Sequence, residues 1–116
     1  MLLIEYPKCS TCVKARKYLD SKKIAYEVRD IVNDKLSANE LEEFIKMSKK
    51  DVNKFFNTSG LKYRALHLKD KLPILSYEEK LELLSTDGML VKRPLLVLED
   101  NVLIGFKEKE WEQIKD

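Results

Sequence analysis

Both cysteines of the chain, Cys9 and Cys12, lie three residues apart near its beginning. They stand where an apolar run over residues 2–6 gives way to a helical pattern that starts at Ser10. A cysteine in the first turn of a helix faces unpaired backbone N–H groups and the positive end of the helix dipole, and both favour the thiolate. Because the thiolate is the reactive form, this junction predicts nucleophilic or redox chemistry.

The order of the two thiols along the helix predicts different roles for them. Cys9 falls at or just before the first turn and should be the more acidic thiol, whereas Cys12 lies about one turn further in. A spacing of three places Cys12 on the same face, close enough to resolve a mixed disulfide or sulfenic acid at Cys9. The alternative is two small buried hydrophobic side chains that happen to be close. Two cysteines and one histidine are too few for a closed zinc site, so no metal is expected.

Composition restricts the setting of this chemistry. A chain of 116 residues suits one domain with one core, spanning 1–116. The 22 lysines and arginines nearly balance the 20 acidic residues, which argues against direct binding of nucleic acid by bulk charge. No apolar stretch approaches the roughly 20 residues of a membrane span, and no signal-peptide pattern precedes the first strand. We expect a cytoplasmic monomer that binds no membrane, and in that reducing compartment a close cysteine pair is more often redox-active than structural.

The elements that position the cysteines form two blocks at the ends of the chain. Residues 2–6 and 24–30 favour strands and residues 10–21 a helix, a strand-helix-strand unit whose two strands should be parallel. The second block contains two further strands and a closing helix, predicted over 95–98, 102–106 and 108–114.

The middle of the chain is predicted to be helical. Ser37 and Ser76 each have capping-box spacing and open helices, the second of which ends at Asp87 and Gly88. No linker or repeat sets this region apart, so residues 33–89 are predicted to be an insertion packed on the sheet rather than a second domain. The aromatic residues predicted to fill the core between insertion and sheet are Phe44, Phe55, Phe56, Tyr63 and Trp111.

Four segments carry a resemblance to a known family: YPKCSTC at 6–12, FNTSGLKYR at 56–64, DGMLVKRPLLV at 87–97 and GFK at 105–107. In this order and over nearly the whole chain, they resemble the arsenate reductase-related family that also contains the Spx transcription regulators. The resemblance implies an α/β, thioredoxin-like fold with a βαβ unit, a helical insertion, a ββα unit and a mixed four-stranded sheet. It also implies a cis bond between Arg93 and Pro94 beside the cysteine loop.

The resemblance also implies the roles of individual residues. Cys9 is the nucleophile, Cys12 resolves the product, and Arg93 is the cation beside them. Enzymes of this family hold an oxyanion with three arginines, and here only Arg93 matches, since Ser59 replaces one arginine and Lys107 stands near the third. Weak or absent arsenate reduction is therefore expected. The substrate site implied by the resemblance comprises Ser10, Thr11, Ser59, Arg64, Arg93, Pro94 and Lys107.

Two functions from different classes fit these residues. The first is a thiol-dependent oxidoreductase of the arsenate reductase-like type, which takes a small thiol or oxyanion substrate, has no bound cofactor and is reduced by glutathione, glutaredoxin or thioredoxin. The second is an Spx-like redox-sensing regulator that contacts the C-terminal domain of the RNA polymerase α subunit. Two features favour the oxidoreductase. The chain stops soon after the last predicted helix, without the C-terminal extension typical of Spx, and the segment 57–60 resembles the reductases more than Spx.

Overall fold

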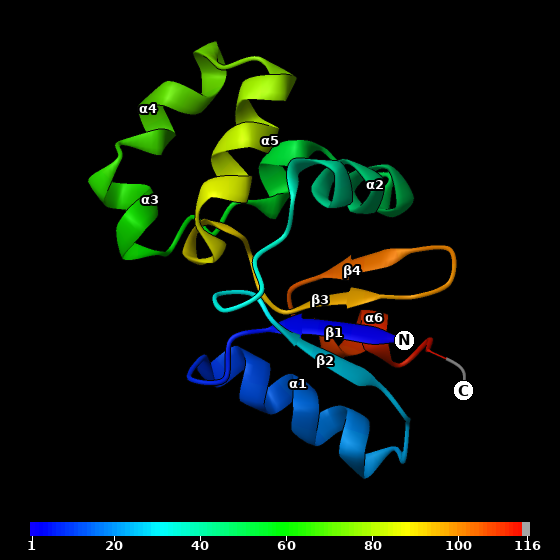
Figure 1. Ribbon diagram of the computed structural model, residues 1–116. Coiled ribbons are helices and arrows are strands. Elements are labelled where there is room, and N and C mark those ends of the chain that lie inside the picture. Colours follow the sequence, from blue (N-terminus) through cyan, green and yellow to red (C-terminus); the bar gives the residue numbers. More distant parts are fainter. Residues whose placement is uncertain (115–116) are drawn as a thin grey trace.

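A four-stranded mixed sheet lies at the centre of the computed structural model, which describes residues 1–114 (Figure 1). The strand order is β2-β1-β3-β4. β1 runs parallel to β2 and antiparallel to β3, which pairs antiparallel with β4. The strand bounds are Leu2–Glu5 (β1), Glu27–Asp30 (β2), Leu95–Val97 (β3) and Val102–Ile104 (β4). The mixed sheet and the parallel first pair confirm the predicted α/β fold.

Helices cover both faces of this sheet. Figure 1 shows α1 (Ser10–Ser21) on one side and the helical middle of the chain on the other. The first face also carries α6 (Glu108–Trp111). The middle consists of α2 (Ala38–Ser48), the short 3-10 helix η1 (Val52–Phe55), α3 (Leu61–Ala65), α4 (Leu68–Lys71), η2 (Leu72–Ile74), α5 (Tyr77–Thr86) and η3 (Gly88–Leu90). Within residues 1–114, no helix is long and apolar enough to cross a membrane.

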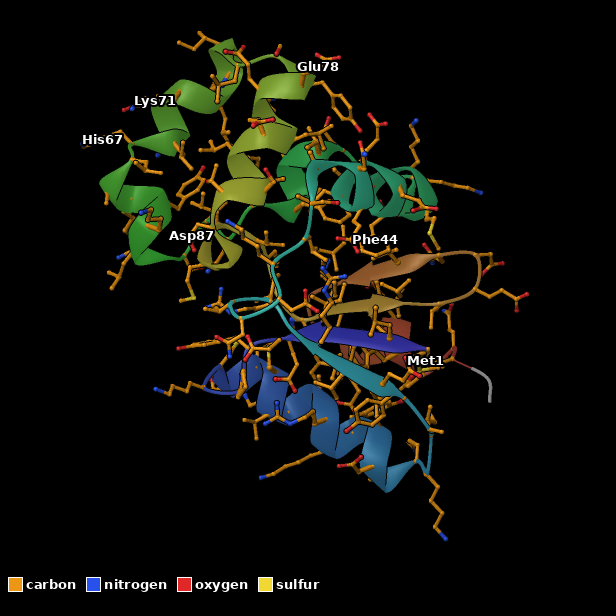
Figure 2. All side chains as sticks on the ribbon, in the orientation of Figure 1. Met1, Phe44, His67, Lys71, Glu78 and Asp87 are labelled. Carbon is orange, nitrogen blue, oxygen red and sulfur yellow. The ribbon has the colours of Figure 1, made fainter. Side chains whose placement is uncertain are left out.

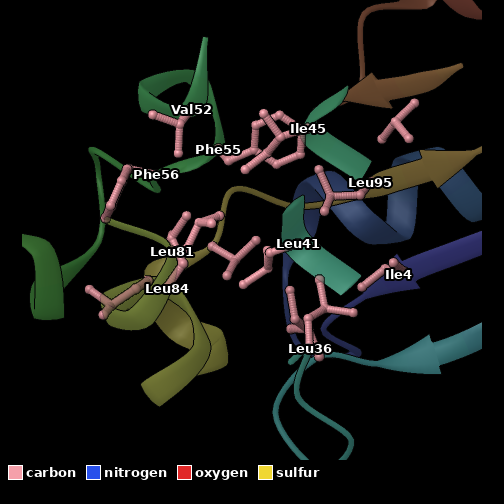
Figure 3. Packing of buried hydrophobic residues seen from close by; sticks show 14 of the residues in the cluster. Ile4, Leu36, Leu41, Ile45, Val52, Phe55, Phe56, Leu81, Leu84 and Leu95 are labelled. Atoms are coloured by element: carbon pink, nitrogen blue, oxygen red, sulfur yellow. The ribbon is translucent and has the colours of Figure 1, made fainter. Parts of the chain in front are cut away.

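Alternation along β1 divides the apolar residues between two cores. Leu3 packs against Ala15 and Leu19 of α1, whereas its neighbour Ile4 faces the helical middle. Figure 3 shows part of the second core, where Ile4 and Leu95 of the sheet meet the residues of the insertion that surround Leu41. The structure therefore has one core on each face of the sheet.

One core assignment from the sequence was wrong. Trp111 does not lie between the insertion and the sheet but on the opposite face, with α1. There its ring stands edge-on to Phe106, with centroids 4.8 Å apart, and also contacts Tyr18. The cause is the hairpin formed by β3 and β4, which returns the chain so that α6 packs beside α1.

The predicted boundaries hold to within a few residues. Helix α1 has exactly the predicted bounds, and α5 ends just before Asp87, as predicted. β2 begins at Glu27 rather than 24. The Ile24 N–H instead donates a hydrogen bond to the Leu19 carbonyl at the end of α1, and the Ile24 side chain packs in the core under that helix. α6 ends at Trp111 rather than 114. The bond between Arg93 and Pro94 is cis, which confirms the expectation.

Helix α2 is fixed to β2 by a polar network at its first turn. The Ser37 hydroxyl accepts a hydrogen bond from the Glu40 N–H at 3.1 Å, and the Glu40 carboxylate accepts one from the Ser37 N–H at 3.0 Å. The same carboxylate receives two hydrogen bonds from Arg29 of β2, at 2.6 and 3.0 Å. Hydrogen bonds from Arg29 and Ser37 lower the pKa of Glu40 to about 2.

Replacing Glu40 by glutamine should therefore reduce stability in a pH-dependent way. The folded-state pKa lies below the unfolded value of about 4.3, so the contribution of the carboxylate is present above that value and is lost as the pH falls toward 2. Urea unfolding should show a loss of about 1 kcal/mol at neutral pH and no difference from wild type near pH 2. Ser37→Ala, which removes the cap but keeps the carboxylate, is the control and should retain the wild-type pH dependence. An equal deficit of Glu40→Gln at both pH values would contradict this assignment.

Candidate active site

Cys9 occupies the N-cap position of α1, directly after the loop that leaves β1. Its backbone is extended, with φ −82° and ψ 123°, and its carbonyl accepts the first helical hydrogen bond, from Val13 at 3.0 Å. Its own N–H donates to the Tyr6 carbonyl at 3.0 Å, which closes the loop against the end of β1. The Cys9 side chain is half-buried and forms no disulfide. The sulfur thus faces the positive end of the helix and remains accessible.

The surroundings of Cys9 favour its thiolate. Burial, the largest single effect, opposes ionisation, but the N–H and thiol of Cys12, the N–H of Thr11 and the charge of Arg93 together outweigh it and hold the pKa of Cys9 below its usual value. Because Arg93 follows the helical insertion in sequence, its effect on Cys9 shows that the fold brings these two predicted site residues together.

Cys12 has the opposite environment. Its side chain is fully buried in the first turn of α1, and its sulfur accepts a hydrogen bond from the Tyr6 N–H at 3.5 Å. Burial raises the pKa of Cys12 to about 12, against the effect of that hydrogen bond and with additional contributions from Cys9 and the charge of Glu5. The order of acidity predicted from the sequence is confirmed, and Cys12 is a thiol at neutral pH.

Arg93 presents unused hydrogen-bond donors next to the cysteines. Its Nε and Nη1 atoms are buried and have no partner among residues 1–114. Its guanidinium carbon lies 5.4 Å from the centroid of the Tyr6 ring, which holds the group beside the cysteine loop. A half-buried guanidinium with unpartnered donors is suited to an anionic group, which it attracts through its charge and its N–H groups.

Arg93 also lines an open cleft of about 660 Å³, which residues of the insertion otherwise form and which we call the Arg93 cleft. Its walls are mostly apolar, and Leu61 on its rim is 82% exposed. Lys62 and Asp87 in the cleft are paired with each other at 3.7 Å, so Arg93 is the cation of this lining that is not in an ion pair with a carboxylate. The lining residues are Asn57, Ser59, Gly60, Leu61, Lys62, Ala65, Asp87, Met89 and Arg93.

Some of the predicted substrate residues are gathered at this site. Ser59 lines the cleft with Arg93, Pro94 follows Arg93 through the cis bond, and Ser10 and Thr11 form the first turn of α1 after Cys9. Figure 2 shows Asp87 at the end of α5, on the side of the insertion nearest the sheet, and places His67, the one histidine of the chain, at the outer edge of the insertion.

Two predicted substrate residues lie elsewhere. Arg64 is exposed on α3 and is not among the residues that line the cleft. Lys107, at the N-cap of α6, lines a separate hollow of about 430 Å³. The cations in that hollow are Lys50, Lys54, Lys92 and Lys107. Of the predicted substrate cations, Arg64, Arg93 and Lys107, only Arg93 both lines the cleft and acts on Cys9.

Sequence reasoning missed a third polar residue near the cysteines, Glu5 at the end of β1. It is buried and ion-paired with Arg16 of α1, and its charge acts on Cys12. The available signal was an acidic residue at an inward-facing position of an otherwise apolar strand.

The fold and the position of the cysteine pair define a protein of the thioredoxin-like class, with a thiol at the start of the first helix and a cis-proline loop beside it. Residues 4–114 match the ArsC family, and the chain belongs to that family.

Relatives in this family include proteins with different names. The uncharacterized protein YusI of Bacillus subtilis is 47% identical over 93% of this chain and 92% of its own length. The global transcriptional regulator Spx of Listeria innocua is 29% identical over 90% of this chain and 78% of its own length. A crystal structure of an ArsC family related protein from Bacteroides fragilis is 51% identical, covers 98% of this chain and 96% of that one, and superimposes with a TM-score of 0.95.

Proposed function

We propose that this protein is a thiol-dependent oxidoreductase of the arsenate reductase-like type, with Cys9 as nucleophile and Cys12 as resolving thiol. One observation carries the proposal: a half-buried thiol with a lowered pKa lies within the field of a guanidinium whose Nε and Nη1 donors are buried and unpartnered. A nucleophile beside an unsatisfied anion-binding group is what reduction of an anionic substrate requires.

The reaction has two steps on a disulfide substrate. The Cys9 thiolate attacks one sulfur of the substrate, so that a mixed disulfide forms and the other half leaves as a thiolate. The Cys12 thiol then attacks the Cys9 sulfur, loses its proton and expels the second half, which leaves a disulfide between Cys9 and Cys12. The substrate has gained two electrons, and glutathione, glutaredoxin or thioredoxin returns them to the protein.

Arg93 selects the substrate class in this proposal. Its guanidinium, which borders the cleft, attracts a carboxylate or oxyanion next to the bond that Cys9 attacks, and the apolar walls of the cleft contact the rest of the molecule. A small disulfide that carries a carboxylate fits both features. Arsenate fits less well, because Ser59 in the cleft offers a neutral hydroxyl and Lys107 lies in a separate hollow.

Arg93→Gln should therefore lower reactivity toward anionic disulfides selectively. Loss of a charge-assisted hydrogen bond is worth about 1.5 to 3 kcal/mol, or roughly ten- to a hundredfold in rate. We would compare an anionic probe, the disulfide of thionitrobenzoate, with the uncharged dipyridyl disulfide in Cys12→Ser protein, and measure arsenate turnover with glutaredoxin and with thioredoxin alongside. The anionic probe should lose at least tenfold more rate than the neutral one, and arsenate turnover should be weak.

Arg64→Gln is the matched control, since it removes the same charge from an exposed helix position that does not line the cleft. It should leave the ratio of the two rates unchanged. If Arg93→Gln slowed both probes equally, Arg93 would act only through the pKa of Cys9 and not as a binding group.

The second candidate is an Spx-like redox-sensing regulator, supported by the match to Spx over 90% of this chain. In this role the cysteine pair would sense oxidation, and the output would be contact with the C-terminal domain of the RNA polymerase α subunit. Binding of the purified α domain to reduced and oxidised protein distinguishes the two functions. Tight binding that depends on the redox state, together with no turnover of any disulfide, would favour the regulator.

A further inference from the structure

Glu5 is a buried acid that the two-step reaction described above does not use. It is the last residue of β1 and lies on the same face of that strand as Leu3, which packs under α1. The residue is only 2% exposed, although acidic residues are rarely buried unless they are paired. Its position places a carboxylate beneath the first turns of the helix that carries both cysteines.

The partners of Glu5 satisfy only half of its carboxylate. Arg16 of α1 donates to Oε1 in a short ion pair, whereas Oε2 is buried and has no hydrogen-bond partner in the described structure. Arg16 lies four residues after Cys12 and therefore on the same face of α1. The Cys12 sulfur accepts the N–H of Tyr6, the residue next to Glu5. Glu5 and Cys12 are therefore both buried between the end of β1 and the first turns of α1.

The surrounding charges make Glu5 and Cys12 one electrostatic unit. Besides burial, the charge of Glu5 raises the pKa of Cys12, and an ionised Cys12 would in turn act on Arg16. Two other titratable groups act on this cluster: Cys9, which contributes to the pKa of Cys12, and Tyr26, which is influenced by Glu5 and Arg16 and donates to Asp20 at 2.9 Å. A buried carboxylate oxygen without a donor is unfavourable, and a proton supplied by Cys12 would satisfy it.

The resolving step needs such a proton acceptor. With a pKa of about 12, five pH units above neutrality, only roughly one Cys12 in 10⁵ is a thiolate at pH 7. When Cys9 is tied up in a mixed disulfide, its charge and its hydrogen bond to Cys12 disappear. Burial and the charge of Glu5 remain, so Cys12 stays protonated until a base takes the proton.

We propose that Oε2 of Glu5 accepts the proton of Cys12 as Cys12 attacks the mixed disulfide on Cys9, an inference that rests on the proposed function. In this step a bond forms between the two protein sulfurs, and the bond between Cys9 and the substrate sulfur breaks. The substrate sulfur leaves with the electron pair, and the proton passes from Cys12 to Glu5 and then to the departing thiolate or to solvent. Arg16 pairs with the other carboxylate oxygen, Oε1, so Oε2 is free to accept the proton.

A disulfide of thionitrobenzoate separates the two steps, because each releases one coloured thiolate. Attack by Cys9 releases the first equivalent and resolution by Cys12 the second. Glu5→Gln should leave the first release within about twofold of wild type and slow the second by roughly a hundredfold at pH 7, as for loss of a general base. If wild type released only one equivalent, the proposed function would fail, whereas a selective defect in the second release concerns Glu5 alone.

If Glu5 acted on Cys12 only through its charge, Glu5→Gln would change the rate of the second release in the opposite direction. Removal of the negative charge of Glu5 would then lower the pKa of Cys12 and accelerate the second release. Arg16→Gln is the matched variant, because it breaks the same ion pair but keeps the carboxylate, and it should retain a second release at least ten times faster than Glu5→Gln. An unchanged or faster second release in Glu5→Gln, or an equal defect in Arg16→Gln, would overturn the proposal.

The wild-type protein provides a test that does not depend on the folding of a variant. With a protein carboxylate as base, the second release does not depend on hydroxide, so its rate should be level across neutral pH. A rate that rises tenfold with each pH unit from neutral into the alkaline range would mean that hydroxide removes the Cys12 proton, and would exclude Glu5 from this role.

Discussion

Cys9→Ser protein should show no reaction with small disulfides above that of the buffer, although its fold should be intact. A serine hydroxyl is not ionised at these pH values, and the remaining thiol, Cys12, is fully buried and has a pKa of about 12. The measurement is thiolate release from a disulfide probe, with circular dichroism to confirm the fold. Rapid reaction of Cys9→Ser would show that Cys12 is the nucleophile, and the assigned roles would then be exchanged.

The pH dependence of the wild-type reaction follows from the same environment. Since the thiolate reacts and the pKa of Cys9 is lowered, the rate should rise with pH and reach half its maximum at a lower pH than the rate of a free thiol does. Two replacements of Cys12 act as a matched pair. Cys12→Ser keeps a side-chain donor to Cys9 and should preserve the midpoint, whereas Cys12→Ala removes the donor and should move the midpoint to higher pH.

The part of the site that depends on local structure could be predicted from the sequence. The apolar run before the cysteines forms β1, and Ser10 begins α1. Cys9 lies at the N-cap of α1 and Cys12 within its first turn, and this difference in position was enough to predict which thiol is the more acidic. The capping boxes at Ser37 and Ser76 were equally local and are both present.

The part that depends on distant contacts could not be predicted in the same way. The position of Lys107 in the GFK segment did not indicate on which side of the chain its side chain lies, and in the structure it lines a separate hollow. Glu5 lies within the predicted strand over residues 2–6, but only the packing of α1 on β1 shows that it is buried and that its charge acts on Cys12. Trp111 was assigned to the wrong core for a similar reason. The hairpin of β3 and β4 decides which face of the sheet α6 covers, and this could not be predicted from the sequence.

Gly88 is a further residue whose role the sequence showed only in part, and its replacement should have the largest effect on stability. From the sequence it ends a helix, but in the structure η3 brings it directly against the backbone of the loop after β2. A Cβ at this position would overlap the carbonyl oxygen of Ile31 and lie 2.7 Å from its carbonyl carbon. These atoms belong to the main chain at the edge of the sheet, so they cannot move aside as a flexible side chain would.

Gly88→Ala should therefore destabilise the protein by roughly 3 kcal/mol or more, at or above the upper end for an added methyl group in a packed interior. That is a large part of the roughly 5 to 15 kcal/mol by which a domain of this size is stable. Gly60→Ala is the matched control, because a Cβ there would meet chiefly the end of the Asn57 side chain, at 2.8 Å, and the backbone φ of −78° suits alanine. Urea unfolding of both variants should show a large shift of the midpoint for Gly88→Ala and a small one for Gly60→Ala. Equal, small shifts would mean that the loop after β2 can withdraw from η3, and that this contact does not hold the insertion, and with it the Arg93 cleft, against the sheet.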